Sequence, residues 1–514
     1  MSMTWLASVD RGTFWAHRAW SDFAALPDKE RHVVILPLHG FADHGLGLPL
    51  DAEEILGSAV IRHAVLQAGN AVPCHVLPPI RFGLAPYPSS FFGLDAETAH
   101  ALLHDIAVSV KAAGYHKLVF FNTSPWSREL VVDASRDIRV GQKLQTFIIQ
   151  TPALGFDFHP ASEKRSQAQS AVSHVLGRPA QIPTRPPEVR NTNFRPGCYL
   201  QPAPLAPNPS IDGAAVLKAA GQHLARLLSE TQARPPLGSV EQRTPAVLPN
   251  LQPPTPAPVF PEKIRARYLP SLTRDELEAL PNKDRALVII PTGAIEQHGH
   301  HLPVGVDAIL GQAWLENILP RLTADAPVFV APPLTIGKSN EHHAFPGTLS
   351  VSVTTFRRML LAIAEQLKAL GFRQVAILNT HGGNSAVVVA TLREIQTTLG
   401  LRAGLLGWPY KPDLPAQEAV YGFHAGEWET SLMLAVADEL VAMPKAVCEY
   451  PAQLSDPGEL RPEDAPAIIS WSTEDISRSG VMGDATAATH EKGLRWLDAQ
   501  SAALARRIEE LLGG

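Results

Sequence analysis

Short uninterrupted runs of apolar residues recur along the chain. The run VVILP begins at Val33, LVFFN at Leu118, ALVIIP at Ala286 and VAILNT at Val375. Continuous apolar runs of this length, rich in β-branched and aromatic side chains, are typical of strands buried on both faces of a sheet. These four runs therefore predict central strands.

A second pattern, of helical periodicity, alternates with these runs. The segment TTFRRMLLAIAEQLKALG has apolar residues at helical spacing and ends on Gly371, a favoured residue at a helix C-terminus. Strands that alternate with helices predict a layered α/β fold with a largely parallel sheet. Ligand sites in such folds lie beyond the carboxyl ends of the strands. Two polar motifs fall there, EQHGHH after the run at Ala286 and HGGN after the run at Val375.

One proline-rich segment interrupts the alternation. Residues 234–261 read RPPLGSVEQRTPAVLPNLQPPTPAPVFP. This density of proline disfavours helices and central strands and favours an extended spacer. We therefore predict a domain at 1–233, a linker at 234–261 and a second domain at 262–514.

The two predicted domains are related in sequence. RHVVILPLHGFADHGLGLPLDAEEIL, from Arg31, aligns without gaps with RALVIIPTGAIEQHGHHLPVGVDAIL, from Arg285. The same offset of 254 residues pairs VLPPIRFG with VAPPLTIG, and a further shift of three residues pairs AAGYHKLVFFNTS with ALGFRQVAILNTH. The pattern indicates a duplicated domain rather than a short solenoid repeat.

Composition narrows the class of protein. Hydrophobic residues make up 45% of the 514 positions and charged residues 18%, which is an ordinary globular balance. A net charge of -6 without long charged runs gives no reason to expect a nucleic-acid or membrane partner. The three cysteines, Cys74, Cys198 and Cys448, form no paired-thiol motif. The first residues of the chain contain no apolar signal region. We therefore expect a cytoplasmic protein.

Metal-competent side chains concentrate in the second half. Glu296 and His298 are two residues apart, so an extended backbone would point both toward one site, and Asp307 follows with two oxygens that could bridge two cations. A second segment, just past a predicted strand, reads NTHGGN and offers His381, with Gly382, Gly383 and Asn384 where the backbone can approach a ligand.

Two further segments add candidates. HAGEWETS offers His424 as a general acid or base, and either Glu427 or Glu429 as a carboxylate that completes a metal shell. Thr430 and Ser431 are interpreted as structural. The segment SNEHH, from Ser339, is interpreted as a loop that lines the pocket, with His342 among its candidates for substrate contact.

Carboxylate and imidazole ligands without thiolate suit Zn²⁺ or Mn²⁺, with Fe²⁺ as an alternative. Five ligands with one shared aspartate indicate two cations, which would acidify a bridging water and polarise a carbonyl. No G-x-S-x-G or Walker A motif competes with this interpretation.

PTGAIEQHGHHLPVGVD, EHHAFPGTLS, NTHGGN and HAGEWETS, in this order and spacing, resemble the creatininase (creatinine amidohydrolase) family. The resemblance covers most of residues 262–514. It implies a three-layer α/β/α domain with a binuclear metal centre, usually assembled into higher oligomers. Known members open the creatinine ring, deformylate a formamidopyrimidine, or remove a C-terminal dipeptide from a redox-cofactor precursor.

The resemblance also implies roles for individual residues. Glu296, Asp307 and His381 resemble the ligands of one metal, and His298 with the bridging Asp307 those of the other. His424 matches the histidine that carries a proton to the leaving nitrogen. Creatininases proper have a metal-binding glutamate where this chain has Gly383. We therefore favour Glu429 over Glu427 as the remaining ligand, assign Glu427 to catalysis beside His424, and regard creatinine as a doubtful substrate.

The first half retains the sequence pattern of the domain but lacks most of the candidate metal ligands. Ala42 stands where the second half has Glu296, Glu53 where it has Asp307, and Ser124 where it has His381. His44 and His159 are retained, and Lys164 takes the place of Glu429, where its ammonium could fill the space of a missing cation. We expect a pseudo-enzyme domain that packs on the active one as a second subunit would.

The sequence thus predicts two creatininase-like three-layer α/β/α domains, the second a binuclear metal amidohydrolase acting on a small, cyclic amide or lactam. Trp408 and Trp428 are expected to wall the pocket, and the chain to form a homo-oligomer. Two alternatives are a peptidase-like family member that trims a modified peptide, and a non-catalytic metal-binding scaffold.

Overall fold

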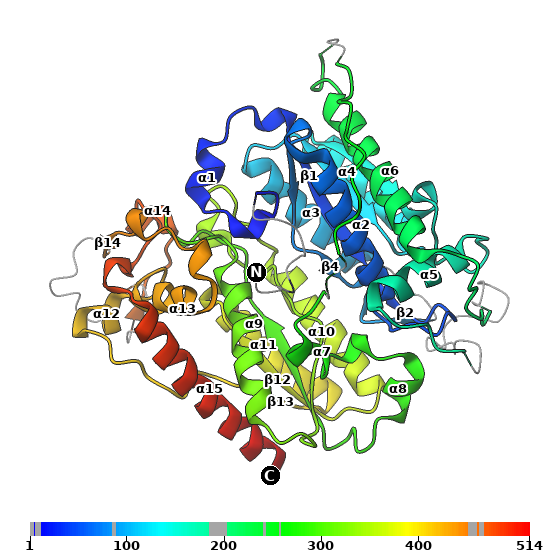
Figure 1. The fold of residues 1–514 in the computed structure, drawn as a ribbon. Coiled ribbons are helices and arrows are strands. Elements are labelled where there is room, and N and C mark those ends of the chain that lie inside the picture. Colours follow the sequence, from blue (N-terminus) through cyan, green and yellow to red (C-terminus); the bar gives the residue numbers. More distant parts are fainter. Residues whose placement is uncertain are drawn as a thin grey trace.

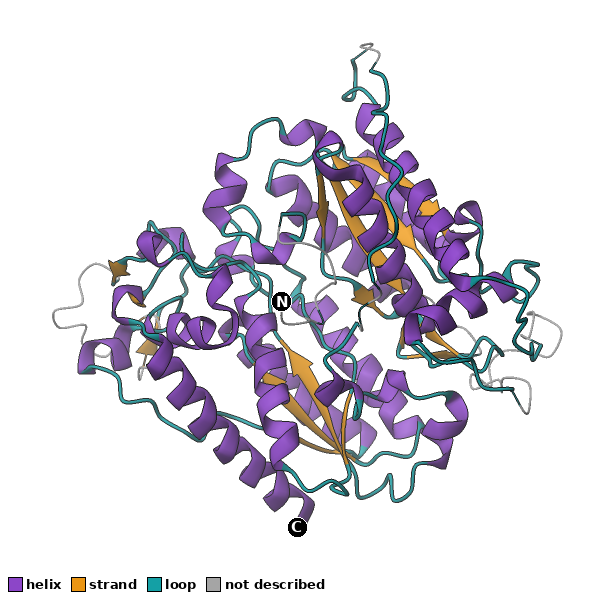
Figure 2. Ribbon diagram, viewed as in Figure 1, coloured by secondary structure: helices purple, strands orange, loops and turns teal. Residues whose placement is uncertain are grey.

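The computed structural model describes residues 5, 12–84, 89–183, 203–239, 243–255, 257, 259–450, 460–461 and 467–513. The chain folds into two α/β units, each with a parallel sheet covered by helices (Figures 1 and 2). The predicted fold class, two α/β domains with largely parallel sheets, is confirmed.

The first sheet has the strand order β3-β1-β8-β9, and β4 also pairs with β1. Every residue of β1 and β8 is buried, which explains their continuous apolar sequences. Helices α2 and α6 pack together on one side of this sheet, and α3 and α4 pack together on the other (Figure 1). The bounds are β1 (Val33–His39), β3 (Cys74–Val76), β4 (Ile80–Arg81), β8 (Lys117–Asn122), β9 (Gln145–Gln150), α2 (Ala52–Ala68), α3 (Ala96–Ala112), α4 (Arg128–Gly141) and α6 (Gly213–Ala233).

The second sheet repeats this plan with the order β11-β10-β12-β13. Helices α9, α13 and α15 pack against one another, and α10 packs against α11. Helix α10 begins at the Ser352 cap and is followed by Gly371 at φ +100°, as its sequence predicts. The bounds are β10 (Leu287–Thr292), β11 (Val328–Val330), β12 (Gln374–Asn379), β13 (Arg402–Leu405), α9 (Val306–Ile318), α10 (Val353–Ala369), α11 (Ser385–Glu394), α13 (Glu427–Ala437) and α15 (His490–Gly513).

Shorter elements complete the two units. They are α1 (Trp20–Ala25), α5 (Arg165–Leu176), α7 (Glu262–Arg265), α8 (Arg274–Ala279), α12 (Ala416–Tyr421) and α14 (Thr473–Ile476), with the strand pairs β2 (Phe41–Ala42) and β6 (Ser90–Phe91), β5 (Gly83–Leu84) and β7 (Gly93–Leu94), β14 (Cys448–Glu449) and β17 (Gly483–Asp484), and β15 (Leu460–Arg461) and β16 (Ala467–Ile468).

Helix α6 ends at Ala233 and α7 begins at Glu262, and no described residue between them lies in a helix or strand. The exact domain boundaries stay predictions. Cys74 and Cys448 are free thiols, whereas Cys198 lies outside the described residues. Among the described helices, none is both long and apolar enough to cross a bilayer.

The two halves contact each other reciprocally. Gly305 N–H donates to the Ala16 carbonyl at 2.9 Å, and 254 positions earlier Asp51 N–H donates to the Pro270 carbonyl at 3.0 Å. Val304 with Arg18, and Leu50 with Leu272, form a second pair of equivalent bonds at 2.8 and 3.0 Å. Contacts in which two equivalent surfaces exchange the same bonds define an isologous interface. The halves are therefore arranged as a pseudo-dimer within one chain.

Candidate metal centre

The candidate site lies beyond the carboxyl ends of the adjacent strands β10 and β12. These strands pair in parallel up to Thr292 and Asn379, so the segments that follow them emerge side by side. Glu296 and His298 follow β10, and His381 follows β12. The first turns of two helices add the remaining carboxylates, Asp307 from α9 and Glu429 from α13.

The described residues form four overlapping groups of three metal-competent side chains, and two of these groups share Asp307. Glu296, Asp307 and His381 offer three ligand atoms within 4.8 Å of one another, and so do His298, Asp307 and Glu429. Nδ1 of His381 lies 3.2 Å from Glu296 Oε1 and 3.6 Å from Asp307 Oδ2. Nε2 of His298 lies 3.6 Å from Asp307 Oδ1 and 3.8 Å from Glu429 Oε2. The geometry is that of a pair of cation sites joined by a bridging carboxylate.

Several oxygen and nitrogen atoms of these side chains have no hydrogen-bond partner in the described part of the protein and are suited to bind cations. Glu296 Oε2, His298 Nε2 and Asp307 Oδ2 are buried and have no hydrogen-bond partner among the described residues. Buried polar atoms without partners are costly, and divalent cations would satisfy all three. Oxygen and nitrogen donors without sulfur suit Zn²⁺ or Mn²⁺.

Backbone carbonyls orient three of the imidazoles. Nδ1 of His298 lies 3.0 Å from the Glu296 carbonyl, Nε2 of His381 lies 2.9 Å from the Lys338 carbonyl, and Nε2 of His424 lies 2.8 Å from the Gln297 carbonyl. A carbonyl oxygen only accepts, so each of these nitrogens is the donor. The opposite nitrogen of each ring then faces the centre, which is the usual outer-shell arrangement around a metal.

His342 also lies within the centre. Its Nε2 is 3.4 Å from Glu296 Oε1, its ring stacks on His424 at 4.5 Å, and its Nδ1 is 2.6 Å from Thr473 Oγ1. The sequence motif predicted only a substrate contact for His342. Its position beside Glu296 also allows it to act on protons at the site or to bind a cation.

The charges of the site are mutually dependent. Burial alone would raise the pKa of Glu296, but His342 and His381 hold that pKa well below its usual value. Burial alone would lower the pKa values of His298 and His381, but Asp307 and Glu429 raise that of His298 to about 9, and Glu296 and Asp307 raise that of His381 to about 10. Protons on the two rings thus balance the buried carboxylates, and divalent cations would supply the same positive charge.

Burial raises the pKa of Glu429 to about 7, and a hydrogen bond from Ala425 N–H to its Oε2 at 2.6 Å opposes this rise. Ala425 has φ +54°, a strained value for a residue with a side chain. The turn at Ala425 brings both His424 and Glu429 next to His298, with ring centroids of His424 and His298 4.3 Å apart and Glu429 Oε2 3.8 Å from His298 Nε2.

His424 is buried next to His298, with the two ring centroids 4.3 Å apart. Burial, together with His298 and His342, lowers the pKa of His424 well below its usual value. The ring is therefore neutral in this environment, and its Nδ1 lies 3.7 Å from Glu296 Oε1.

The structure does not bring Glu427 to the centre. Glu427 and Glu429 are two residues apart on α13 and therefore point in different directions. The Glu427 carboxylate instead pairs with Lys492 of α15. Its predicted catalytic role has no geometric support.

Trp408 and Trp428 lie in an aromatic cluster rather than among the five candidate ligands. The ring centroids of Trp408 and Trp428 lie 5.5 and 6.5 Å from that of Trp314, and the ring centroid of Trp428 lies 5.3 Å from that of Trp496. The ring of Trp471 instead lies next to His342, with centroids 6.2 Å apart, and Phe423 contacts Trp471 with centroids 5.8 Å apart. Neither was singled out from the sequence.

The backbone of the HGGN segment packs closely against His381 and Glu341. A Cβ on Gly383 would lie 2.1 Å from Glu341 Oε1 and 2.5 Å from His381 Nε2, whereas one on Gly382 would meet nothing within 4 Å. The side-chain amide of Asn384 is hydrogen-bonded to two backbone groups: it accepts from Lys338 N–H at 2.9 Å and donates to the Gly293 carbonyl at 3.0 Å.

Two side chains noted in the sequence motifs, Ser339 and Gln297, contact the candidate histidines. Ser339 Oγ lies 3.2 Å from His381 Nε2. The amide nitrogen of Gln297 lies 3.0 Å from both Nδ1 of His342 and Nε2 of His424. Its position between Glu296 and His298 was the one available signal for this role. Glu341 lies in the SNEHH motif, whereas no sequence motif singled out Thr473.

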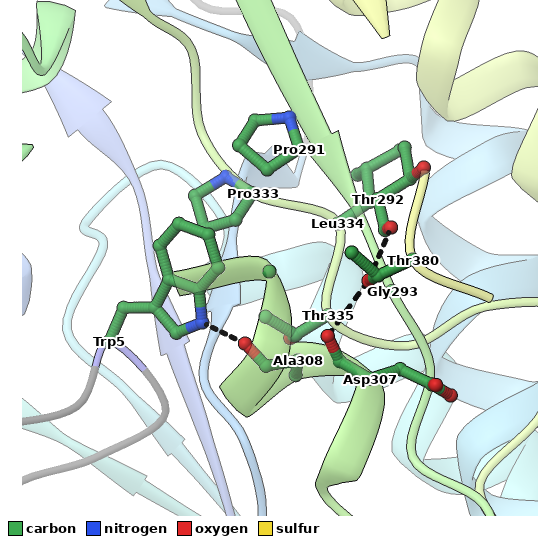
Figure 3. A pocket seen from close by; sticks show the side chains of 11 residues that line it. Trp5, Pro291, Thr292, Gly293, Asp307, Ala308, Pro333, Leu334, Thr335 and Thr380 are labelled. Atoms are coloured by element: carbon green, nitrogen blue, oxygen red, sulfur yellow. Dashed lines mark hydrogen bonds between the residues drawn. The ribbon is translucent and has the colours of Figure 1, made fainter. Parts of the chain in front are cut away.

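A small cavity of about 10 Å³ lies beside the backbone of Asp307 (Figure 3). The indole of Trp5 covers it and donates to the Ala308 carbonyl at 2.9 Å, while Thr380 Oγ1 donates to the Asp307 carbonyl at 2.8 Å. The Asp307 carboxylate points away from Trp5 in this view. The cavity has room for about one water molecule, so it is not the substrate site.

The equivalent position in the first half is filled by protein groups. Glu53 lies 3.1 Å from His44 and accepts from Gly40 N–H at 2.7 Å. No described residues of this half form a group of three metal-competent side chains. The suggestion that the Lys164 ammonium replaces a cation is wrong, because Lys164 is exposed and donates to the Pro152 carbonyl at 2.7 Å.

A family of known proteins matches both halves of the sequence. A sequence model of the creatininase family, described as creatinine amidohydrolase, matches residues 16–175 and 270–508. The mycofactocin precursor peptide peptidase of Mycolicibacterium smegmatis is 30% identical over 211 residues, which cover 41% of this chain and 78% of that protein. The creatinine amidohydrolase of Pseudomonas putida is 30% identical over 264 residues, 47% of this chain and 96% of that protein.

A crystal structure of creatinine amidohydrolase (creatininase) superposes with a TM-score of 0.40 and 26% identity, over 48% of this chain and 97% of that chain. The family match by itself spans most of the sequence and falls in two regions, as the internal repeat predicts. The chain therefore belongs to the creatininase family and carries one copy of the family domain in each half.

Proposed function

We propose that the second half of the chain is a hydrolase that uses two divalent cations to cleave a C–N bond in a small amide or lactam, most simply a cyclic one. The observation that carries this proposal is the pair of ligand groups that share Asp307. The atoms left without partners, Glu296 Oε2, His298 Nε2 and Asp307 Oδ2, would face the cations.

Bound Zn²⁺ or Mn²⁺ would supply Lewis acidity toward the substrate carbonyl and lower the pKa of a water molecule. The residues of the chain would do the rest. Glu296, Asp307 and His381 would hold one cation, and His298, Asp307 and Glu429 the other. The carbonyl groups of Glu296 and Lys338 fix the ring orientations of His298 and His381, so the opposite nitrogen of each ring would face the cations.

His424 would move the proton. Its Nε2 is held as a donor by the Gln297 carbonyl, which leaves Nδ1 as the acceptor on the side of the centre. A neutral imidazole can take a proton from water and return it to the leaving nitrogen. Gln297 and His342, both in contact with the ring, would keep it in place.

Metal removal tests this proposal. We expect dialysis of the full chain against a chelator to abolish hydrolysis of cyclic amides, and Zn²⁺ or Mn²⁺ to restore it. Glu296→Gln and His381→Ala are expected to remove bound metal, measured by elemental analysis. Full activity after complete demetallation would refute the proposed mechanism.

A second candidate is a peptidase that trims a modified peptide. The similarity to the mycofactocin precursor peptide peptidase over 78% of that protein favours it. The same centre would serve, because a peptide bond is also an amide. A parallel screen of cyclic amides and short peptides separates the two candidates, and activity on peptides alone would favour the second.

The remaining elements of the proposal concern the whole chain. We propose that residues 1–233 form a domain without metal, joined by the linker 234–261 to the active domain 262–514. We further propose a cytoplasmic homo-oligomer. Metal analysis of chains altered in one half only would test the first statement, and light scattering the last.

A further inference from the structure

The segment Trp15–Phe23 of the first half lies against the second half. Trp20 donates from Nε1 to the Ser479 carbonyl at 3.0 Å, and its ring contacts His300 at 4.6 Å and Phe345 at 5.0 Å. All three partners belong to loops of the second half. Trp20 therefore holds together loops that are far apart in the sequence.

Two more side chains of this segment hold the loop at Gly347. Trp15 donates from Nε1 to the Gly347 carbonyl at 2.7 Å and is fully buried. Phe23 packs so closely that a Cβ on Gly347 would lie 2.5 Å from its ring. Gly347 also has φ +103°, so only glycine accommodates this contact without strain.

The backbone of the segment holds a third loop. Val304 and Gly305 donate their N–H groups to the carbonyls of Arg18 and Ala16 at 2.8 and 2.9 Å. The contacts of the segment Trp15–Phe23 with the second half thus include three places: 304–305, 345–347 and 479.

Each of these places lies within one residue of a contact with the segment Glu296–His298. The Val304 carbonyl accepts from Glu296 N–H at 2.8 Å. Thr348 Oγ1 accepts from Gln297 N–H at 3.1 Å, and the Gly480 carbonyl accepts from the Gln297 side chain at 3.0 Å. The loops that surround two candidate ligands are therefore fixed from outside by the other half.

We propose that the segment Trp15–Phe23, with Trp20 at its centre, positions the metal centre of the second half. The proposal rests on the proposed function, since it takes that centre as the active site. It gives the first half a role that needs no metal of its own: it supplies the surface against which the loops of the active half are ordered.

The internal symmetry provides a matched control. The residue 254 positions after Trp20 is Arg274, which lies on α8 and reaches the first half, where it pairs with Asp43 at 3.0 Å. Arg274 thus occupies the equivalent place at the interface but faces the half without a metal group.

Hydrogen exchange of the full chain tests the proposal without any substrate. In Trp20→Ala we expect the amides of 345–349 and 479–483 to exchange about tenfold faster, as expected for the loss of one hydrogen bond and two ring contacts. Mn²⁺ affinity, measured by calorimetry with the metal alone, is expected to fall by about ten- to a hundredfold. Arg274→Ala should leave both quantities unchanged.

Unchanged exchange in Trp20→Ala, or equal acceleration of these amides in Arg274→Ala, would overturn the proposal. Trp20→Phe keeps a smaller aromatic ring and loses the N–H that donates to the Ser479 carbonyl, so it should restore protection at 345–349 and not at 479–483. This variant decides the question if Trp20→Ala does not fold, because unchanged exchange at 479–483 would contradict the proposed contact. If the unaltered chain binds no Mn²⁺, the proposed function fails, whereas the exchange comparison still decides the positioning role.

Discussion

Asp307 is the one side chain shared by both candidate cation groups, whereas Glu429 belongs to one of them. This difference predicts distinct metal contents. Asp307→Asn should lose both cations, because each site loses a charged ligand. Glu429→Gln should lose only the cation held with His298. Elemental analysis of the two purified variants checks this, and equal metal contents would contradict the bridging role of Asp307.

A substitution at Gly383 would show how tightly the side chain of His381 is packed. A methyl group there would lie 2.1 Å from Glu341 Oε1 and 2.5 Å from His381 Nε2. We expect Gly383→Ala to destabilise the chain by about 1–3 kcal/mol, as overpacking does, and to weaken metal binding. Chemical denaturation and calorimetry would measure both effects.

The neighbouring Gly382 is the control, since a Cβ there meets nothing within 4 Å. Gly382→Ala should change stability by no more than about 0.5 kcal/mol. Similar losses in both variants would show that the backbone, rather than the contact with His381, requires glycine at these positions.

The local motifs predicted the candidate ligands because each contributes its residues within a few positions of a strand or helix end. Glu296 and His381 follow paired strands, so their proximity is a consequence of the parallel sheet. The contacts of His342 with Thr473 and Trp471 join segments about 130 residues apart. No local pattern records such a contact, so sequence reasoning missed both partners.

Among the elements, helices α13 and α15 are joined by the ion pair between Glu427 and Lys492. The Glu427 side chain is buried, and its orientation toward α15 separates it from the metal centre. Glu427→Gln should leave metal content unchanged and destabilise the chain by about 1–3 kcal/mol, because a buried charged contact is lost. Thermal denaturation and elemental analysis measure the two effects.

Lost hydrolysis in Glu427→Gln with normal stability would instead support the catalytic role first inferred from the sequence. That inference failed at the scale of the element. Glu427 and Glu429 both lie in the first turn of α13. Residues two positions apart on a helix point in nearly opposite directions, so Glu427 faces α15 and Glu429 faces the centre.

The strands were predicted more completely than the loops between them. The four apolar runs correspond to β1, β8, β10 and β12, because burial on both faces leaves a continuous apolar sequence. The ends of the sheets were not predicted. The burial pattern of β13 is mostly intermediate, and its sequence RAGL is too short and too mixed to indicate a strand.

At the scale of the molecule, the reciprocal bonds between the halves predict that they unfold together. Metal-competent groups of three occur only in the second half of the described chain, yet loops of that half are held by Trp15, Arg18 and Trp20 of the first. Cation binding to the second half should therefore stabilise the entire chain. At a free cation concentration about a hundred times Kd, each site contributes about 2.7 kcal/mol.

For a chain of this length, we expect chelation to lower a single thermal transition by about 2–3 °C for each cation removed. Differential scanning calorimetry of the chain with Zn²⁺ and with a chelator measures this shift. His44→Ala, which alters the equivalent position of the first half, should leave the shift unchanged because that half contributes no cation. Two separate transitions, of which only one responds to the chelator, would show that the halves unfold independently and that the interface does not couple them.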